Sequence, residues 1–268
     1  MIHRDELSSN LVGVPTSVLA SVDFNAEPRP LHVSGVREDH HTLFRYLSEA
    51  ASAFAAGTTF QDYMTVVFAL TLVGRRDDGQ TLRHYTASYL KLLADWGFDA
   101  NGVAGAVLKA WVESRFGLYP TFHKGPLPSG LSGPHWSTYV TEKMASRYHN
   151  NSIYQQIDLL YEFCQWHLAR FNDDSTAHIK LYRGVNRVDE ERVGKRTRGH
   201  EMVVTLNNLS SFTHCREIAD EFGDYILEVD VPKVKILFFN ELLPRHPLKG
   251  EAEYLVIGGE YRVTRHTL

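Results

Sequence analysis

The sequence predicts an α+β protein, with a helical N-terminal half (residues 1–174) and a β-rich C-terminal half (residues 175–268). In the first half, apolar residues recur every three or four positions, which is typical of amphipathic helices. In the second half they recur every second position, which is typical of strands. Hydrophobic residues make up 43% and charged residues 22% of the 268-residue chain. These values are typical of a globular protein, so we expect both halves to pack as one compact unit.

Helices are expected in the first half wherever the apolar spacing is regular. The segments are Leu43–Leu47, Phe60–Phe68, Leu82–Trp96, Val103–Phe116 and Ile153–Leu168. We expect Gly74, Gly97 and Gly117 to end three of them, because glycine commonly follows the last helical residue. Residues 119–134, rich in proline and glycine, are expected to form a long irregular connection.

Strands are expected in the second half, arranged in a mostly antiparallel sheet. The segments are Ile179–Tyr182, Met202–Leu206, Tyr225–Val231, Val234–Phe239, Tyr254–Ile257 and Tyr261–Thr264. Helical spacing over Cys215–Phe222 interrupts them.

The charge and the apolar runs argue against several classes of protein. The net charge is −4, and the basic cluster within 192–198 is interrupted by glycine, which indicates a loop rather than a nucleic-acid-binding face. The apolar run 11–22 is short and broken by Gly13 and Pro15, so we expect no signal peptide and no membrane span. We therefore expect a cytoplasmic protein.

Neither the cysteines nor the histidines predict a metal site. Cys164 and Cys215 are too few for a zinc site and are expected to be small buried apolar residues. The 14 histidines are scattered without the spacing of metal ligands. No metal is expected.

Three polar features of the second half are candidates for chemistry. Arg183-Gly184 follows an apolar strand, where an arginine could bind an anion such as phosphate or form a surface ion pair. Ser210–Thr213 places hydroxyls at a strand end, where they could cap a helix or bind a carboxylate or ribose. Glu251 and Glu253 open the apolar run 254–257; on a strand they would share one face, either in solvent or as an active pair.

In this order the three features resemble the arginine–serine–glutamate class of mono-ADP-ribosyltransferases. Over nearly the whole chain, the run Leu181-Tyr182-Arg183-Gly184, the segment 207–213 and the segment 253–263 look like the dinitrogenase reductase ADP-ribosyltransferase family. The resemblance implies an antiparallel two-sheet core and NAD as co-substrate. It also implies transfer of ADP-ribose to an arginine of the nitrogenase iron protein, which switches off nitrogen fixation. The helical half would then recognise the iron protein and a PII-type nitrogen-signalling regulator.

The resemblance also implies a role for each motif residue. Arg183 would bind the phosphates or adjoining ribose of NAD, and the backbone of Gly184 would face the nicotinamide. Ser211 would steady the catalytic Glu253, which would bind the 2′-hydroxyl of the ribose and stabilise the charge that develops as nicotinamide leaves. Glu251 would bind the acceptor guanidinium and assist its deprotonation.

Two further positions and one loop complete the expected site. Thr213 keeps the hydroxyl of the motif, whereas Phe212 departs from it and would pack against the nicotinamide or, by preference, in the core. The segment 244–250 would read the protein substrate.

Two alternative functions remain open from the sequence. The first keeps the NAD chemistry but uses water or another protein as the acceptor, as an NAD glycohydrolase or a different arginine ADP-ribosyltransferase would. The second is a non-catalytic NAD-binding regulatory module, although the costly acidic pair argues against it.

Overall fold

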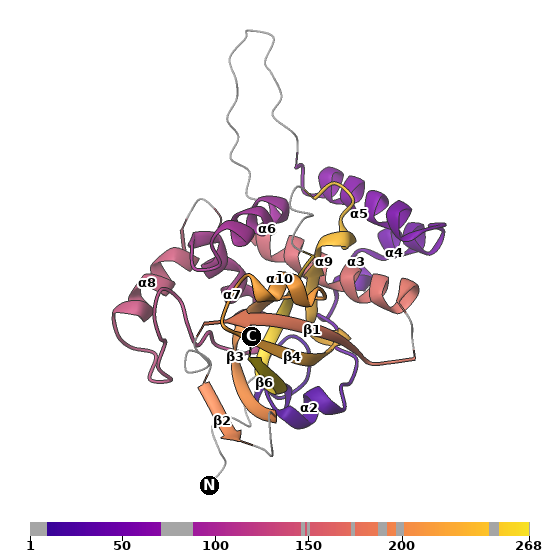
Figure 1. The fold of residues 1–268 in the computed structure, drawn as a ribbon. Helices are drawn as coiled ribbons and strands as arrows, with labels where there is room; N and C mark the ends of the chain where they lie inside the picture. Colours follow the sequence, from indigo (N-terminus) through magenta and orange to yellow (C-terminus); the bar gives the residue numbers. More distant parts are fainter. Residues whose placement is uncertain are drawn as a thin grey trace.

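The computed structural model describes residues 10–70, 88–145, 148, 151–172, 175–186, 192–196, 201–246 and 252–267. Within these ranges, helices α1–α9 precede strands β1–β6, and α10 lies between β3 and β4. The α+β prediction is confirmed, since helices and an antiparallel sheet are both present. In Figure 1, α10 lies across β1, and the helices α4, α5 and α6 lie above the strands.

The helices have the following bounds: α1 Thr16–Leu19, α2 Val22–Ala26, α3 Val36–Asp39, α4 His41–Ser48, α5 Ala53–Val67, α6 Tyr89–Phe98, α7 Val103–Phe116, α8 Pro134–Lys143, α9 Asn151–Phe171 and α10 Arg216–Asp220. Helices are thus confirmed at α4, α5, α6, α7 and α9. Gly117 ends α7 as predicted, with a φ of 72° in the left-handed region that glycine favours.

The prediction that Gly97 ends a helix is wrong, because α6 continues through it to Phe98. The chain turns at Asp99 instead, whose Oδ1 accepts a hydrogen bond from the backbone N–H of Asn101 at 2.9 Å. Ser88 caps the start of α6 by accepting from the N–H of Lys91. The other predicted terminator, Gly74, lies outside the described residues, as do positions 82 and 85.

The strands are β1 His178–Val185, β2 Arg192–Arg196, β3 Glu201–Thr213, β4 Tyr225–Pro232, β5 Ile236–Phe239 and β6 Glu253–Thr267. They form one hydrogen-bonded network in the order β2-β3-β1-β4-β6-β5, with a further pairing between β3 and β6. The predicted division into two sheets stays a prediction. The loop expected around the basic cluster is corrected over residues 192–196, which form β2 and pair with β3.

Three short predicted strand segments are parts of two longer strands. The segment 202–206 extends into β3, and the segments 254–257 and 261–264 are both part of β6. Opposite Gly258 and Gly259, the register of β3 shifts between Leu206 and Leu209. A Cβ on Gly258 would lie 1.9 Å from the carbonyl oxygen of Asn207, so only glycine lets β6 pass this bulge without breaking.

The same bulge connects the sheet to the irregular connection 119–134. Asn207 accepts from the N–H of Thr121 at 3.0 Å and donates to the carbonyl of Phe122 at 2.9 Å. Asn208, 2% exposed, donates to the carbonyls of Lys109 and Leu118. Helix α7 and the connection that follows it are therefore held against β3.

One hydrophobic core contains residues of both halves. Helix α9 packs on β5, and Tyr161 and Gln165 of α9 donate to the carbonyls of Val234 and Ile236, both at 2.8 Å. Leu160 and Val229 belong to the same buried cluster. The boundary near residue 175 thus separates helices α1–α9 from the strands without dividing the core.

Candidate active site

Strand pairing brings the three candidate motifs to one end of the sheet. Tyr182 of β1 pairs with Thr213 of β3, and Thr213 pairs with Glu253 of β6. Arg183 and Ser211 therefore lie beside the first residue of β6, although 70 positions separate the first motif from the last.

A chain of hydrogen bonds joins the serine to the second glutamate. Ser211 Oγ donates to Glu253 Oε1 at 2.6 Å, and the Glu253 side chain is nearly buried. The indole N–H of Trp96 lies 2.9 Å from Ser211 Oγ and 3.1 Å from the same Oε1. One carboxylate oxygen therefore accepts hydrogen bonds from two donors.

Trp96 is a site residue that sequence reasoning missed. It lies on α6 in the helical half and is 3% exposed, so its apolar spacing indicates only a core residue. The one available signal is chemical, because a buried indole N–H needs a partner. The sequence does not say that this partner lies 157 positions away.

Arg183 connects β1 to the same group of residues. Its Nη1 donates to the carbonyl oxygen of Ser211 at 2.8 Å. Its neighbour Gly184 packs under α10, where a Cβ would lie 2.1 Å from the carbonyl oxygen of Ala219. Helix packing therefore requires glycine here, whether or not a ligand also approaches its backbone.

A cavity of about 330 Å³ opens beside this network. Arg183, Gly184, Ser211 and Glu253 line it on the strand side. Its remaining walls include the apolar residues Phe98, Ile218 and Phe222. A concave site with apolar walls and a few converging polar groups is the usual form of a small-molecule site.

A smaller cavity of about 190 Å³ adjoins the first. The two share Trp96, Ala100, Arg183 and Ser211 in their linings. The smaller cavity is more polar, since Lys109, Asn101 and Asn207 also line it.

Phe212 and Thr213 lie between the cavity and the core. Phe212 is 3% exposed, belongs to the main hydrophobic cluster and also lines the larger cavity. Thr213 is buried as well, and its Oγ1 accepts from the N–H of Cys215 at 3.2 Å. Its hydroxyl thereby caps the turn into α10.

Glu251 lies outside the described residues, but its neighbour bears on the predicted pairing. Strand β6 begins at Glu253, and Ala252 has a φ of 46°, in the left-handed region. The alternation of side chains along an extended strand therefore stops at residue 253. A shared face for the two acids does not follow from strand geometry.

The cysteines and histidines form no metal site in the part of the chain that is described. It contains no group of three or more His, Cys, Asp and Glu side chains arranged to hold a metal ion. Cys164 is buried as expected, whereas Cys215 is half-buried at the start of α10 and donates to Glu217. Across the described ranges, every helix is too short or too polar to span a bilayer.

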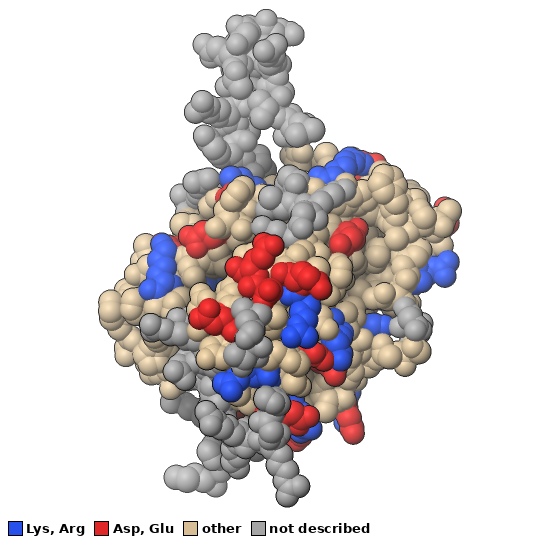
Figure 2. Space-filling view, in the orientation of Figure 1, with Lys and Arg blue, Asp and Glu red and all other residues tan. Residues whose placement is uncertain are grey.

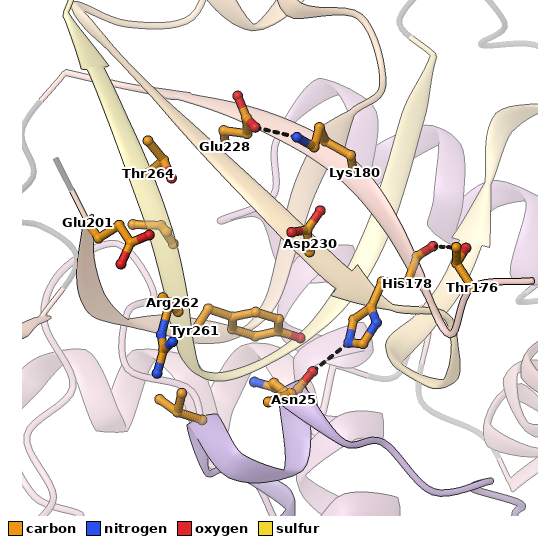
Figure 3. A pocket seen from close by; sticks show the side chains of 13 residues that line it. Asn25, Thr176, His178, Lys180, Glu201, Glu228, Asp230, Tyr261, Arg262 and Thr264 are labelled. Atoms are coloured by element: carbon orange, nitrogen blue, oxygen red, sulfur yellow. Dashed lines mark hydrogen bonds and ion pairs between the residues drawn. The ribbon is translucent and has the colours of Figure 1, made fainter. Parts of the chain in front are cut away.

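Another cavity, of about 650 Å³, lies toward the opposite ends of the strands and is lined by none of the predicted site residues (Figure 3). Several of its polar groups already have protein partners. Lys180 pairs with Glu228 at 2.6 Å, and His178 lies 2.7 Å from the carbonyl oxygen of Asn25. We therefore take the cavity beside Glu253 as the candidate active site.

Comparisons with known proteins agree with the motifs of this site. Residues 9–265 match the family model of dinitrogenase reductase ADP-ribosyltransferase. An NAD(+)–dinitrogen-reductase ADP-D-ribosyltransferase of Rhodospirillum rubrum is 52% identical over 259 residues, which cover 96% of this chain and 94% of that protein. No solved structure is significantly similar to the chain. The chain therefore belongs to the dinitrogenase reductase ADP-ribosyltransferase family.

Proposed function

We propose that this protein transfers ADP-ribose from NAD to an arginine of the nitrogenase iron protein and so switches off nitrogen fixation. The observation that carries the proposal is the bond from Ser211 to Glu253 at 2.6 Å, at the edge of a cavity that Arg183 also lines. The membership of the chain in its family gives the acceptor.

Glu253 is the catalytic group of this proposal. As the bond from the ribose to nicotinamide breaks, positive charge develops on the sugar, and a nearby carboxylate stabilises that charge. The same carboxylate accepts a hydrogen bond from the 2′-hydroxyl of the ribose. Because Ser211 and Trp96 both donate to Oε1, they fix the orientation of the carboxylate before NAD arrives.

Arg183 and the apolar walls would hold NAD in place. The guanidinium lines both cavities, which suits a group that binds the phosphates or the adjoining ribose. Gly184 lines the larger cavity beside Phe222, where a flat aromatic ring such as nicotinamide fits. Phe212 and Thr213 support this wall from behind.

The acceptor would approach from the face that carries α10. Figure 2 shows acidic side chains gathered near the middle of this face, where Figure 1 places α10. The exposed acids in that stretch include Glu217, Asp220 and Glu221. Negative charge beside the cavity favours approach of a cationic side chain. This supports an arginine acceptor, with Glu251 as the proposed base and the segment 244–250 as the reader of the partner surface.

The remaining parts of the proposal concern the core and the regulator. The pairing of β6 with both β3 and β4 supports a two-sheet core of the ADP-ribosyltransferase type. A PII-type signalling protein would act through the helical half, where Phe54 and Val66 of α5 are 70% and 80% exposed. Exposed apolar side chains of this kind are common at protein contacts. Such a system operates in the cytoplasm.

The test is incubation of the purified protein with labelled NAD and iron protein, followed by mass-spectrometric mapping of the modified residue. We expect label on one arginine of the iron protein. Nicotinamide release without labelling, at a rate that iron protein does not change, would instead establish an NAD glycohydrolase. NAD binding without turnover would establish a regulatory module.

A further inference from the structure

The smaller cavity beside Ser211 contains a buried ammonium group that the reaction above leaves unused. Lys109 of α7 is 1% exposed and lines this cavity. Its Nζ donates to Asn101 Oδ1 at 3.0 Å and to the carbonyl oxygen of Phe122 at 3.2 Å, and lies 3.5 Å from His123 Nδ1. Each of these partners is a neutral oxygen or an imidazole nitrogen.

Burying this charge without a carboxylate in direct contact is costly. Among the described residues, no carboxylate oxygen lies within 4.0 Å of Lys109 Nζ. Burial lowers the pKa of Lys109 to about 7; the positive charge of Arg183 also acts to lower it, while the more distant charges of Asp99 and Glu142 act to raise it. Two cations thus face one cavity and repel each other, so an anion between them would relieve both costs.

The position of the cavity identifies the anion. It shares Arg183, Ser211 and Trp96 with the larger cavity, where Glu253 would meet the nicotinamide ribose. In NAD the diphosphate is joined to C5′ of that same ribose. A ribose bound at Glu253 therefore places its diphosphate one bond beyond the sugar, within reach of the neighbouring cavity.

We propose that the smaller cavity is the diphosphate subsite for NAD and that Lys109, together with Arg183, recognises the diphosphate. This inference rests on the proposed function, since it takes NAD as the ligand. A phosphate oxygen would replace the longest of the three Lys109 contacts, the one to His123. Lys109 would then form a charge-assisted hydrogen bond to the phosphate in place of its contact with His123.

The irregular connection 119–134 has a structural role in this proposed subsite. The carbonyl of Phe122 holds Lys109 from one side, while Asn207 holds Phe122 and Thr121 against the bulge of β3. The connection thus forms one wall of the subsite and fixes the direction of the ammonium. A subsite assembled in this way needs little reorganisation on binding.

The experiment compares two buried lysines. Lys235 is fully buried, its pKa is also lowered to about 7, and its Nζ donates to the carbonyl of Gly258 at 3.0 Å. It lines neither cavity of the candidate site. Lys109→Met and Lys235→Met each remove one buried ammonium, but only the first removes a proposed ligand group.

Binding of NAD, ADP-ribose and free nicotinamide to the full-length protein would be measured by calorimetry, alongside KM and kcat for nicotinamide release. For Lys109→Met we expect the Kd of ADP-ribose and the KM for NAD to rise by about tenfold or more, with the affinity for nicotinamide unchanged. Lys109→Arg should recover part of the loss. Lys235→Met should leave the affinities of all three ligands unchanged.

Two results would overturn the inference. One is unchanged ADP-ribose affinity in Lys109→Met, and the other is an equal loss of affinity for ADP-ribose and nicotinamide, which would indicate a merely structural lysine. Failure of the proposed function looks different. The wild-type protein would then release no nicotinamide from NAD, while Lys109-dependent binding of ADP-ribose would still support the subsite.

Discussion

The sharpest prediction concerns the indole N–H of Trp96, which the Trp96→Phe substitution removes while keeping an aromatic ring. In the structure this N–H donates to Ser211 Oγ and to Glu253 Oε1, at 2.9 and 3.1 Å. Without it, the carboxylate keeps the bond from Ser211 but loses its second fixed donor. We expect a lower kcat for NAD cleavage and a smaller change in KM, because the charge on Glu253 matters most in the transition state.

The size of the effect follows from the kind of bond lost. A hydrogen bond to a charged group contributes about 1.5–3 kcal/mol, and each 1.36 kcal/mol is about tenfold in rate. The expected fall in kcat is therefore about 10- to 150-fold.

Trp136→Phe provides a matched control. Trp136 is 6% exposed, and its indole N–H donates to the carbonyl of Pro128 at 2.7 Å. It lies in a separate small hydrophobic cluster and lines neither cavity of the site. Both variants lose a buried bond and part of a ring, at a cost to stability on the order of 1–3 kcal/mol.

The assay is nicotinamide release over a range of NAD concentrations, which gives kcat and KM, together with the Tm of each variant. We expect Trp136→Phe to lose stability but keep kcat and KM. If the two variants lose kcat in proportion to their loss of stability, then Trp96 is only a core residue and the reasoning fails.

Other predictions test the remaining parts of the site. Glu253→Gln should abolish transfer while the affinity for NAD, measured by calorimetry, is kept. Glu251→Gln should lose arginine modification but retain slow nicotinamide release. Equal loss of both activities in both variants would refute this division of roles. Gly184→Ala should lower the free energy of unfolding by about 1–3 kcal/mol in chemical denaturation, because its Cβ would overlap the carbonyl of Ala219; unchanged stability would refute the packing role. Burial lowers the pKa of His167 from 6.5 to about 4. Between these two pH values the unfolded chain binds a proton that the folded chain does not, so the free energy of unfolding decreases as the pH falls. His167→Gln should therefore show a smaller fall in Tm between pH 7 and 5 than the wild type, and an identical fall would contradict this assignment.

The repeating patterns of the sequence predicted the class of fold because periodicity is local. The spacing of apolar residues from Val103 to Phe116 gives both the extent of α7 and, with Gly117, its end. Gly97 shows the limit of the same rule. A glycine can lie inside a helix when a later residue, here Asp99, makes the turn.

Other features depend on contacts between distant segments, which a single sequence does not record. The two predicted segments of β6 form one strand because Gly258 passes close to a bulge in β3. The position of this bulge depends on Asn207, so the glycine alone does not reveal it. Helix α8 begins at Pro134 and carries little periodic signal, so it was missed. Its buried residues Trp136 and Tyr139 join the small cluster with α7.

The residues of the candidate site likewise include some that a local motif predicts and others that only contacts between distant segments reveal. Arg183, Ser211 and Glu253 could be found because each belongs to a short motif whose order along the chain is recognisable. Trp96 and Lys109 could not, since each is a single residue at an ordinary position of a helix. Only the packing of α6 and α7 against β3 shows that both residues border the smaller cavity.

Both halves of the chain contribute side chains to the candidate site. The motif residues lie on strands, yet a donor to Glu253 and the proposed diphosphate ligand come from helices α6 and α7. A movement of α6 by a fraction of an ångström would lengthen the bonds from Trp96 without disturbing any strand, and hydrogen bonds weaken steeply with poor geometry. Under the proposed function, any displacement of α6 would therefore change catalysis without altering the strands of the cavity. That route needs only the contacts already present between Trp96, Ser211 and Glu253, so α6 belongs to the candidate site together with the strands.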